Sequence, residues 1–165
     1  MIRVGALLLL LFLSQGRPAT GKVNSTFDKS ADFNALKSYS WMAGQNAFDP
    51  AVHKAIVSAI DGEMLSLGLK KADAGGDVTI RYLAVRSTSV DLDKLEALEK
   101  QKADPAGADV TVGRLVIVLN GAKSGKRLWA ADSVERLNPT TTDREAVVKS
   151  MVGRMFETYP TRVKK

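Results

Sequence analysis

The chain has 165 residues, with 24 lysines and arginines against 18 aspartates and glutamates and a formal net charge of +6. This length suits one domain, and 45% hydrophobic with 25% charged residues is typical of a folded chain. The absence of cysteine excludes disulfides, thiolate metal sites, a cysteine nucleophile and a lipid anchor on cysteine. The chain also has a single histidine. We therefore assign no catalytic residue, cofactor or metal site from the sequence.

Residues 1–21 are predicted to be a secretory signal peptide. Arg3 supplies a positive start, and Val4–Leu13 is an uninterrupted apolar run. As a helix this run covers about 15 Å, half of the about 30 Å that a membrane span requires. Cleavage after Gly21 is favoured. The alternatives are cleavage after Gly16 or Ala19, or retention of the segment as an anchor.

The positive charge is weak support for a nucleic-acid partner. Arg3 and Arg17 leave with the signal peptide, which lowers the net charge to +4, and residues 161–165 form a basic tail. No cluster of lysines and arginines is interleaved with aromatic residues, as binding to nucleic acid would favour. We expect no nucleic-acid partner, whereas weak association with an anionic membrane surface stays compatible with this charge.

The first half of the exported chain predicts two strands and a helix. The strands cover Lys22–Asp28 and Ser38–Met42, where apolar residues alternate loosely. Asp49 and Pro50 are typical of the cap and first position of a helix, and Gly68 is typical of its end. An apolar stripe along this helix consists of Val52, Ile56, Ile60, Met64 and Leu67.

The second half predicts three further strands with an intervening helix. Asp77–Ser87 alternates, as a strand with one buried face does. Asp91–Lys102 favours a short exposed helix, either over the sheet or as an excursion between two strands. Val110–Leu119 and Arg127–Leu137 form a hairpin, and the apolar run Leu115–Leu119 indicates a strand buried on both faces.

A last helix follows the hairpin. Thr142 and Glu145 match a capping box, and the apolar positions after them continue until Pro160 stops the helix. The elements predict a single α+β domain over residues 22–160, in which two to three helices pack on a mainly antiparallel sheet.

Few residues point to a binding or catalytic site. The segment Gly121–Lys126 fails as a phosphate-binding loop, because its glycines are too close and it joins two strands. Four aromatic residues form a candidate surface for a ligand or partner, although core packing is the commoner role of such residues. They are Tyr39, Trp41, Tyr82 and Trp129.

The order of several short motifs resembles a family of bacterial envelope proteins, domain of unknown function 4136. The resemblance spans about residues 23–160. The motifs are Phe27-Asp28, Asp32-Phe33, Tyr39-Ser40-Trp41, Ile60 with Gly68-Leu69, the block from Asp77 to Tyr82, the strand Leu115–Leu119, and Gly125-Lys126-Arg127-Leu128-Trp129. The resemblance implies export to a Gram-negative envelope, often as a lipoprotein, with no established activity. This chain lacks the lipidated cysteine, which favours the periplasm.

Three functions stay open from the sequence. The favoured one is a non-enzymatic periplasmic module that binds an envelope protein or another envelope component, for example by pairing with the edge strand Lys22–Asp28. The second is a small carrier that holds an apolar or lipid-like ligand between helices and sheet. The third is a hydrolase that uses two carboxylates.

Overall fold

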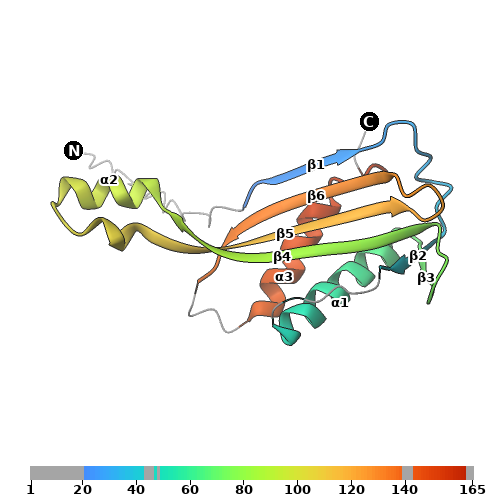
Figure 1. Cartoon of the computed structure of the whole chain (residues 1–165), viewed down its shortest axis with the longest axis horizontal. Coiled ribbons are helices and arrows are strands. Elements are labelled where there is room, and N and C mark those ends of the chain that lie inside the picture. The colour runs from blue at the N-terminus through green and yellow to red at the C-terminus, as the bar shows by residue number, and fades with distance from the viewer. Residues whose placement is uncertain (1–20, 43–46, 48, 139–142, 163–165) are drawn as a thin grey trace, which may run out of the picture.

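The computed structural model of the chain describes residues 21–42, 47, 49–138 and 143–162, which form an α+β domain (Figure 1). Its elements are β1 (Val23–Phe27), β2 (Ser38–Trp41), α1 (Pro50–Ser66), β3 (Lys70–Lys71), β4 (Val78–Val90), α2 (Leu92–Lys100), the 3₁₀-helix η1 (Pro105–Ala108), β5 (Asp109–Gly121), β6 (Arg127–Arg136) and α3 (Arg144–Phe156). The predicted fold class is confirmed. Of the described helices, none is long and apolar enough to cross a membrane, and the predicted signal peptide lies outside the described residues except for Gly21.

The six strands form one sheet in the order β1-β6-β5-β4-β2-β3. The pairs β1–β6, β6–β5 and β5–β4 are antiparallel, whereas β2 is parallel to both β3 and β4. The parallel pairing of β2 with β3 is possible because α1 lies between these strands in the chain, and parallel strands need such a crossover connection. The two-residue strand β3 was not predicted, because two lysines give no hydrophobic pattern.

The two long helices begin at aspartate caps. Asp49 accepts hydrogen bonds from the backbone of Ala51, and Pro50 occupies the first turn of α1, as predicted. Gly68 follows α1 with a φ of 82°, a conformation that favours glycine. The cap of α3 is Asp143, which accepts from the backbone N–H of Ala146. The predicted cap, Thr142, is wrong in this respect and lies outside the described residues.

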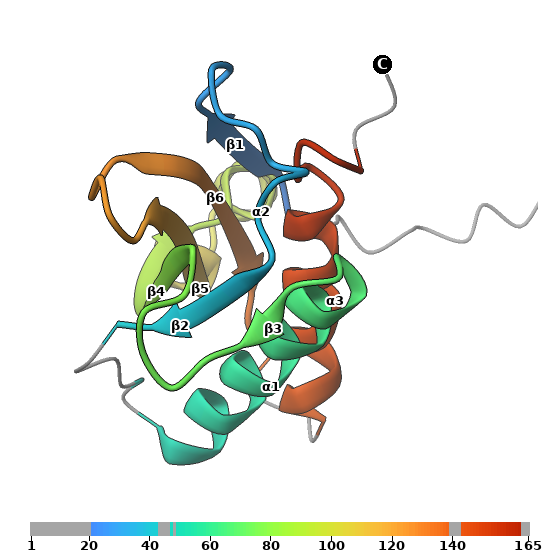
Figure 2. The ribbon, with the colours of Figure 1, turned by 90° about the vertical axis from the view of Figure 1, so that its right-hand side faces the viewer.

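Helices α1 and α3 pack side by side on one face of the sheet, here called the inner face (Figure 2). Every second residue of the central strands points into this layer. The fully buried residues include Ile56, Ile60 and Met64 from α1, Val78 and Ile80 from β4, Ile117 and Leu119 from β5, Trp129 from β6, and Val152, Met155 and Phe156 from α3. These side chains fill the space between sheet and helices.

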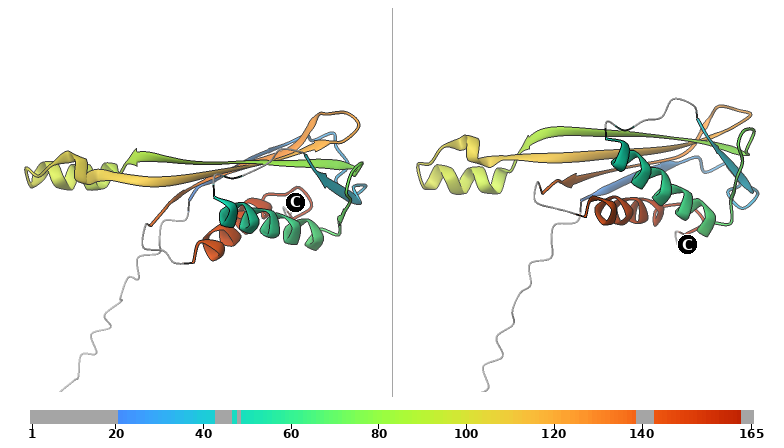
Figure 3. Two further views of the ribbon diagram at one scale, coloured as in Figure 1. Left: turned by 60° about the horizontal axis from the view of Figure 1, so that its bottom comes forward. Right: turned by 90° about the horizontal axis from the view of Figure 1, so that it is seen from below.

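The opposite face of the sheet has no helix over it among the described residues (Figure 3). Leu115, Ile117 and Leu119 are buried on the inner face, whereas Val116 and Val118 alternate with them and are only half-buried. The prediction that Leu115–Leu119 is buried on both faces is therefore wrong. A run of apolar residues resembles a doubly covered strand, but two helices cover only one side of this sheet.

The hairpin of β4 and β5 extends far beyond the rest of the sheet (Figure 1). Strand β6 pairs with β5 only as far as Val112, so the last residues of β4 and the first of β5 pair only with each other. We call residues 88–111, which include α2 and η1, the arm. The helix predicted over Asp91–Lys102 thus forms an excursion between two strands and does not cover the sheet.

The chain beyond α3 turns back onto the domain. Tyr159 is buried, and Arg162 donates from Nη1 to Oε2 of Glu63 on α1 at 2.6 Å. Arg162, which belongs to the predicted basic tail, is therefore held against α1.

Candidate functional site

Three of the four aromatic candidates meet beside α1. Tyr39 and Trp41 lie on the inner face of β2, two residues apart, and both point at Asp61 on α1. The Tyr39 hydroxyl donates to Asp61 Oδ1 at 2.8 Å, and Trp41 Nε1 donates to the same oxygen at 2.9 Å. Lys71 Nζ lies 2.8 Å from the other carboxylate oxygen. One carboxylate thus joins β2 and the β3 segment to α1.

Tyr82 extends this cluster from β4. Its ring meets that of Trp41 edge to face, with centroids 6.3 Å apart. Its hydroxyl shares a hydrogen bond of 2.6 Å with Nδ1 of His53, and the backbone N–H of Ala47 also donates to it. The chain's single histidine therefore acts as a partner of a buried tyrosine. Among the described residues, no group of three His, Asp or Glu side chains is placed to hold a metal ion.

Trp129 lies elsewhere, in an aromatic cluster under α3. Its ring centroid is 5.1 Å from that of Phe156 and 5.7 Å from that of Tyr159, and Phe33 packs on the far side of Tyr159. Trp129 is fully buried, and its Nε1 has no hydrogen-bond partner among the described residues. The structure therefore brings together Tyr39, Trp41 and Tyr82 but not Trp129.

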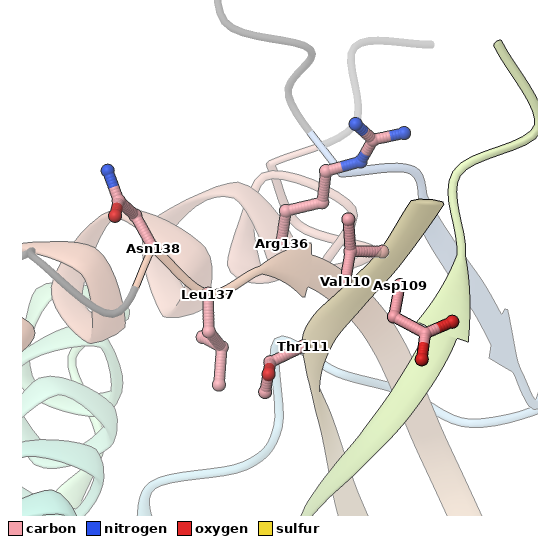
Figure 4. A pocket seen from close by; sticks show the side chains of 6 residues that line it. All are labelled: Asp109, Val110, Thr111, Arg136, Leu137 and Asn138. Atoms are coloured by element: carbon pink, nitrogen blue, oxygen red, sulfur yellow. The ribbon is translucent and has the colours of Figure 1, made fainter. Parts of the chain in front are cut away.

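The four aromatic residues line neither of two hollows on the described surface. One hollow, of about 280 Å³, lies at the base of the arm (Figure 4) and is lined by Asp109, Val110, Thr111, Arg136, Leu137 and Asn138. The other, of about 240 Å³, lies between β1 and the start of β6 and is lined by Thr26, Phe27, Asp28, Lys126, Arg127 and Leu128. In Figure 4, Arg136 and Leu137 point in opposite directions, as neighbours on a strand do.

The uncovered side of the sheet is a larger candidate surface, which we call the open face. It consists of Arg81, Leu83 and Val85 on β4, Val112, Arg114, Val116 and Val118 on β5, and Ala130, Asp132 and Val134 on β6. Apolar side chains on its outer strands keep much of their surface in solvent: Leu83 is 59% exposed and Val85 44% on β4, and Val134 is 37% exposed on β6. Contiguous exposed apolar residues commonly mark an interaction surface.

Charged residues on the open face carry both signs. Arg114 Nη2 lies 2.9 Å from Oδ2 of Asp132 across the β5–β6 pair. Arg81 is exposed and has no ion-pair partner among the described residues, so it leaves the face with a net positive charge. Sequence reasoning missed this surface because it treated Val116 and Val118 as core. The alternation of Leu83 and Val85 with buried positions was the signal that could have revealed it.

Substituting Asp61 should lower the stability of the domain. Asp61→Ala leaves the Tyr39 hydroxyl and Trp41 Nε1 without their acceptor, which we expect to reduce the free energy of unfolding by about 2–3 kcal/mol. Lys71→Ala removes only the exposed ion pair and should cost less than about 1 kcal/mol. Urea unfolding of both variants measures the difference. Equal losses would contradict the role of Asp61 as the shared acceptor.

All three tyrosines of the chain should resist ionisation at alkaline pH. Burial raises the pKa of Tyr159 to about 12 and raises the pKa of Tyr82 despite the Ala47 N–H. Burial, followed by the bond to Asp61, also raises the pKa of Tyr39. Because the unfolded chain ionises first, at about pH 10, this stabilisation is complete below that pH and is lost as the pH rises further. Tyrosinate absorbance of the folded protein should rise only at higher pH than that of the urea-unfolded protein, and coincident titrations would refute this.

Solved structures with a similar fold come from several bacteria. A DUF4136 family protein from Bacteroides thetaiotaomicron is 12% identical with a TM-score of 0.60, and the match covers 88% of this chain and 99% of that one. A PelC dodecamer from Paraburkholderia phytofirmans is 12% identical with a TM-score of 0.55, again over 88% and 99% of the two chains. A PDZ domain protein from Parabacteroides distasonis is 15% identical with a TM-score of 0.60. That match covers 87% of this chain but only 36% of the PDZ domain protein.

A comparison with curated proteins found no match. The family comparison is decisive, because a single family model matches residues 23–161, nearly the whole described domain. This agrees with the resemblance carried by the short motifs, and with the shared fold of the solved family member. The chain belongs to the family described as Domain of unknown function (DUF4136).

Proposed function

We propose that this chain is an exported, non-enzymatic interaction module of the cell envelope, which assembles with further copies of itself through the open face. Family membership supports an envelope protein without an established activity. The predicted signal peptide supports export to the periplasm. The observation that carries the proposal is the open face itself, an apolar sheet surface that no described element covers.

The open face suits a protein partner better than a small ligand. It spans three strands, and Leu83, Val85 and Val134 expose apolar surface at its two sides. Arg81 lies beside Val118, and the Arg114–Asp132 ion pair lies among the apolar residues of the face. Protein–protein interfaces commonly combine apolar residues with charged and hydrogen-bonding groups.

A further copy of the same chain is the partner that we propose. Similar folds include PelC, which was solved as a dodecamer and whose chain this one matches over almost its full length. Most soluble oligomers are assemblies of identical chains. The Arg114–Asp132 pair offers both a donor and an acceptor to such a partner.

No observation favours a carrier or a hydrolase over this proposal. A carrier needs space between sheet and helices, where buried side chains such as Ile60, Ile117 and Met155 pack together. A carboxylate hydrolase needs an acid that keeps its proton. Several of the less exposed carboxylates instead form ion pairs with lysine or arginine side chains. These pairs are Asp61–Lys71, Glu63–Arg162, Asp91–Arg136 and Glu135–Arg154.

The exported protein should be an oligomer, and a charge on the open face should dissociate it. The full chain is expressed in a Gram-negative host, purified from the envelope fraction and measured by size-exclusion chromatography with light scattering. Leu83→Glu places a charge among the apolar residues of the open face, and we expect it to shift the mass toward that of the monomer.

Leu65→Glu is the matched control. Leu65 is 71% exposed on α1, away from the open face, so the mass of this variant should equal that of the unsubstituted protein. A monomer at every concentration of the unsubstituted protein would reject self-assembly. Equal effects of the two substitutions would reject the open face as the interface.

Export has a direct chemical test. We expect N-terminal sequencing of the protein purified from the envelope fraction to begin at Lys22, because Ala19 and Gly21 place small residues at the two positions that signal peptidase reads. A mature chain that begins at Arg17 or Thr20 would correct the cleavage position alone. Retention of Met1 would contradict export with cleavage.

A further inference from the structure

We propose that the arm of one copy docks on the open face of the next copy, so that the assembly interface joins two different surfaces. This inference rests on the proposed self-assembly and names the partner surface within it. The open face is thus the acceptor, and the arm, residues 88–111, is the inserted element.

The arm is an ordered projection. Asp91 at its base accepts from the backbone N–H of Lys94 at 3.2 Å, which caps α2, and from Arg136 Nη1 on β6 at 2.5 Å. The backbone N–H of Asp91 also donates to the carbonyl of Ala108 across the hairpin. Asp104 caps η1 by accepting from the backbone N–H of Ala106. Such an arm loses little conformational entropy on docking, which favours binding.

The arm also carries apolar side chains that the domain leaves in solvent. Leu92 in the first turn of α2 is 72% exposed, and Val90 at the end of β4 is 49% exposed. No residue of the domain body covers them among the described residues, because β4 and β5 carry the arm away from α1 and α3 (Figures 1 and 3). The hairpin runs out of the sheet, so the arm does not reach the open face of its own chain, and the acceptor that we propose is the open face of another copy.

The charges of the two surfaces are opposite. The arm contains six acidic and three basic residues, a formal net charge of −3 in a chain of +6, and it stays acidic although Asp91 already pairs with Arg136 on β6. The open face is positive through Arg81, since Arg114 already pairs with Asp132. Two acidic arms, or two positive open faces, would repel each other. Contact between an arm and an open face is therefore favoured over contact between two like surfaces, and it should weaken as salt screens these charges.

An interface between two different surfaces determines the kind of assembly. Each copy donates one arm and accepts one arm, so association continues until a ring closes or an open chain grows. A symmetric dimer through two open faces would use each face once and stop at two copies. The proposed interface therefore has two separable halves. A copy whose arm is disabled can still bind the arm of another copy on its open face.

Mixing two variants tests this asymmetry. Leu92→Glu disables the arm and Leu83→Glu disables the open face, and both residues are exposed, so both variants should fold. We expect each variant alone to be monomeric, with the affinity between copies reduced at least about tenfold. An equimolar mixture should form a heterodimer, in which the intact arm of the Leu83→Glu variant occupies the intact face of the Leu92→Glu variant. Light scattering and native mass spectrometry measure how many copies of each variant the complex contains.

Further variants keep the outcomes distinct. Val90→Glu should reproduce the effect of Leu92→Glu at a second arm position, and Leu65→Glu should change nothing. Circular dichroism and thermal unfolding confirm that each variant is folded. If Leu83→Glu dissociates the assembly while Leu92→Glu and Val90→Glu do not, the open face is an interface but the arm is not its ligand. If the two monomeric variants fail to form a heterodimer on mixing, the donor–acceptor pairing is overturned. A monomeric unsubstituted protein rejects the proposed function itself.

Discussion

The central constraint in this fold is that two helices pack on one face of a six-stranded sheet. Burial of Ile56, Ile60 and Met64 against the inner face gives the domain its core. Each buried side chain of this size contributes about 1.5–3 kcal/mol, so the inner face is where the sheet gains its stability. The same arrangement leaves the opposite face uncovered, with apolar residues that alternate with the core. The buried core and the exposed apolar surface therefore have one cause, because successive side chains of a strand point to opposite faces of the sheet.

The aromatic and acidic residues of the short motifs have structural roles in this domain. Tyr39 and Trp41 share Asp61 as an acceptor, which holds β2 to α1. Asp77 accepts from the backbone N–H groups of Lys37 and Ser38, which aligns the starts of β2 and β4. These backbone and hydroxyl donors lower the pKa of the Asp77 carboxyl. The motifs that mark the family thus include residues that hold this fold together, and Arg81, Val116 and Val118 of the same motifs lie on the open face.

Local patterns were sufficient for most of the elements. The cap at Asp49, the stripe of α1 and the alternation of β4 are short-range features, and the structure confirms them. The two-residue strand β3 exists only because β2 offers it backbone partners. The cap of α3 is Asp143 rather than Thr142, and the local pattern does not separate them because both residue types cap helices well. The candidate site was predicted only in part. Three of the four aromatic residues converge, whereas Trp129 packs under α3. The sequence does not show which helix covers which strand, because the helices and strands that pack together are far apart in the chain.

The sequence by itself determined the α+β class, the order of the long elements and the membership of the family, because hydrophobic period, caps and turn residues act over a few neighbours. It also excluded cysteine chemistry outright. Only the tertiary structure decided that Val116 and Val118 face solvent, because burial depends on whether a distant helix reaches that side of the sheet. It likewise decided that residues 88–111 project as an arm, because β6 ends its pairing with β5 at Val112 while β4 continues.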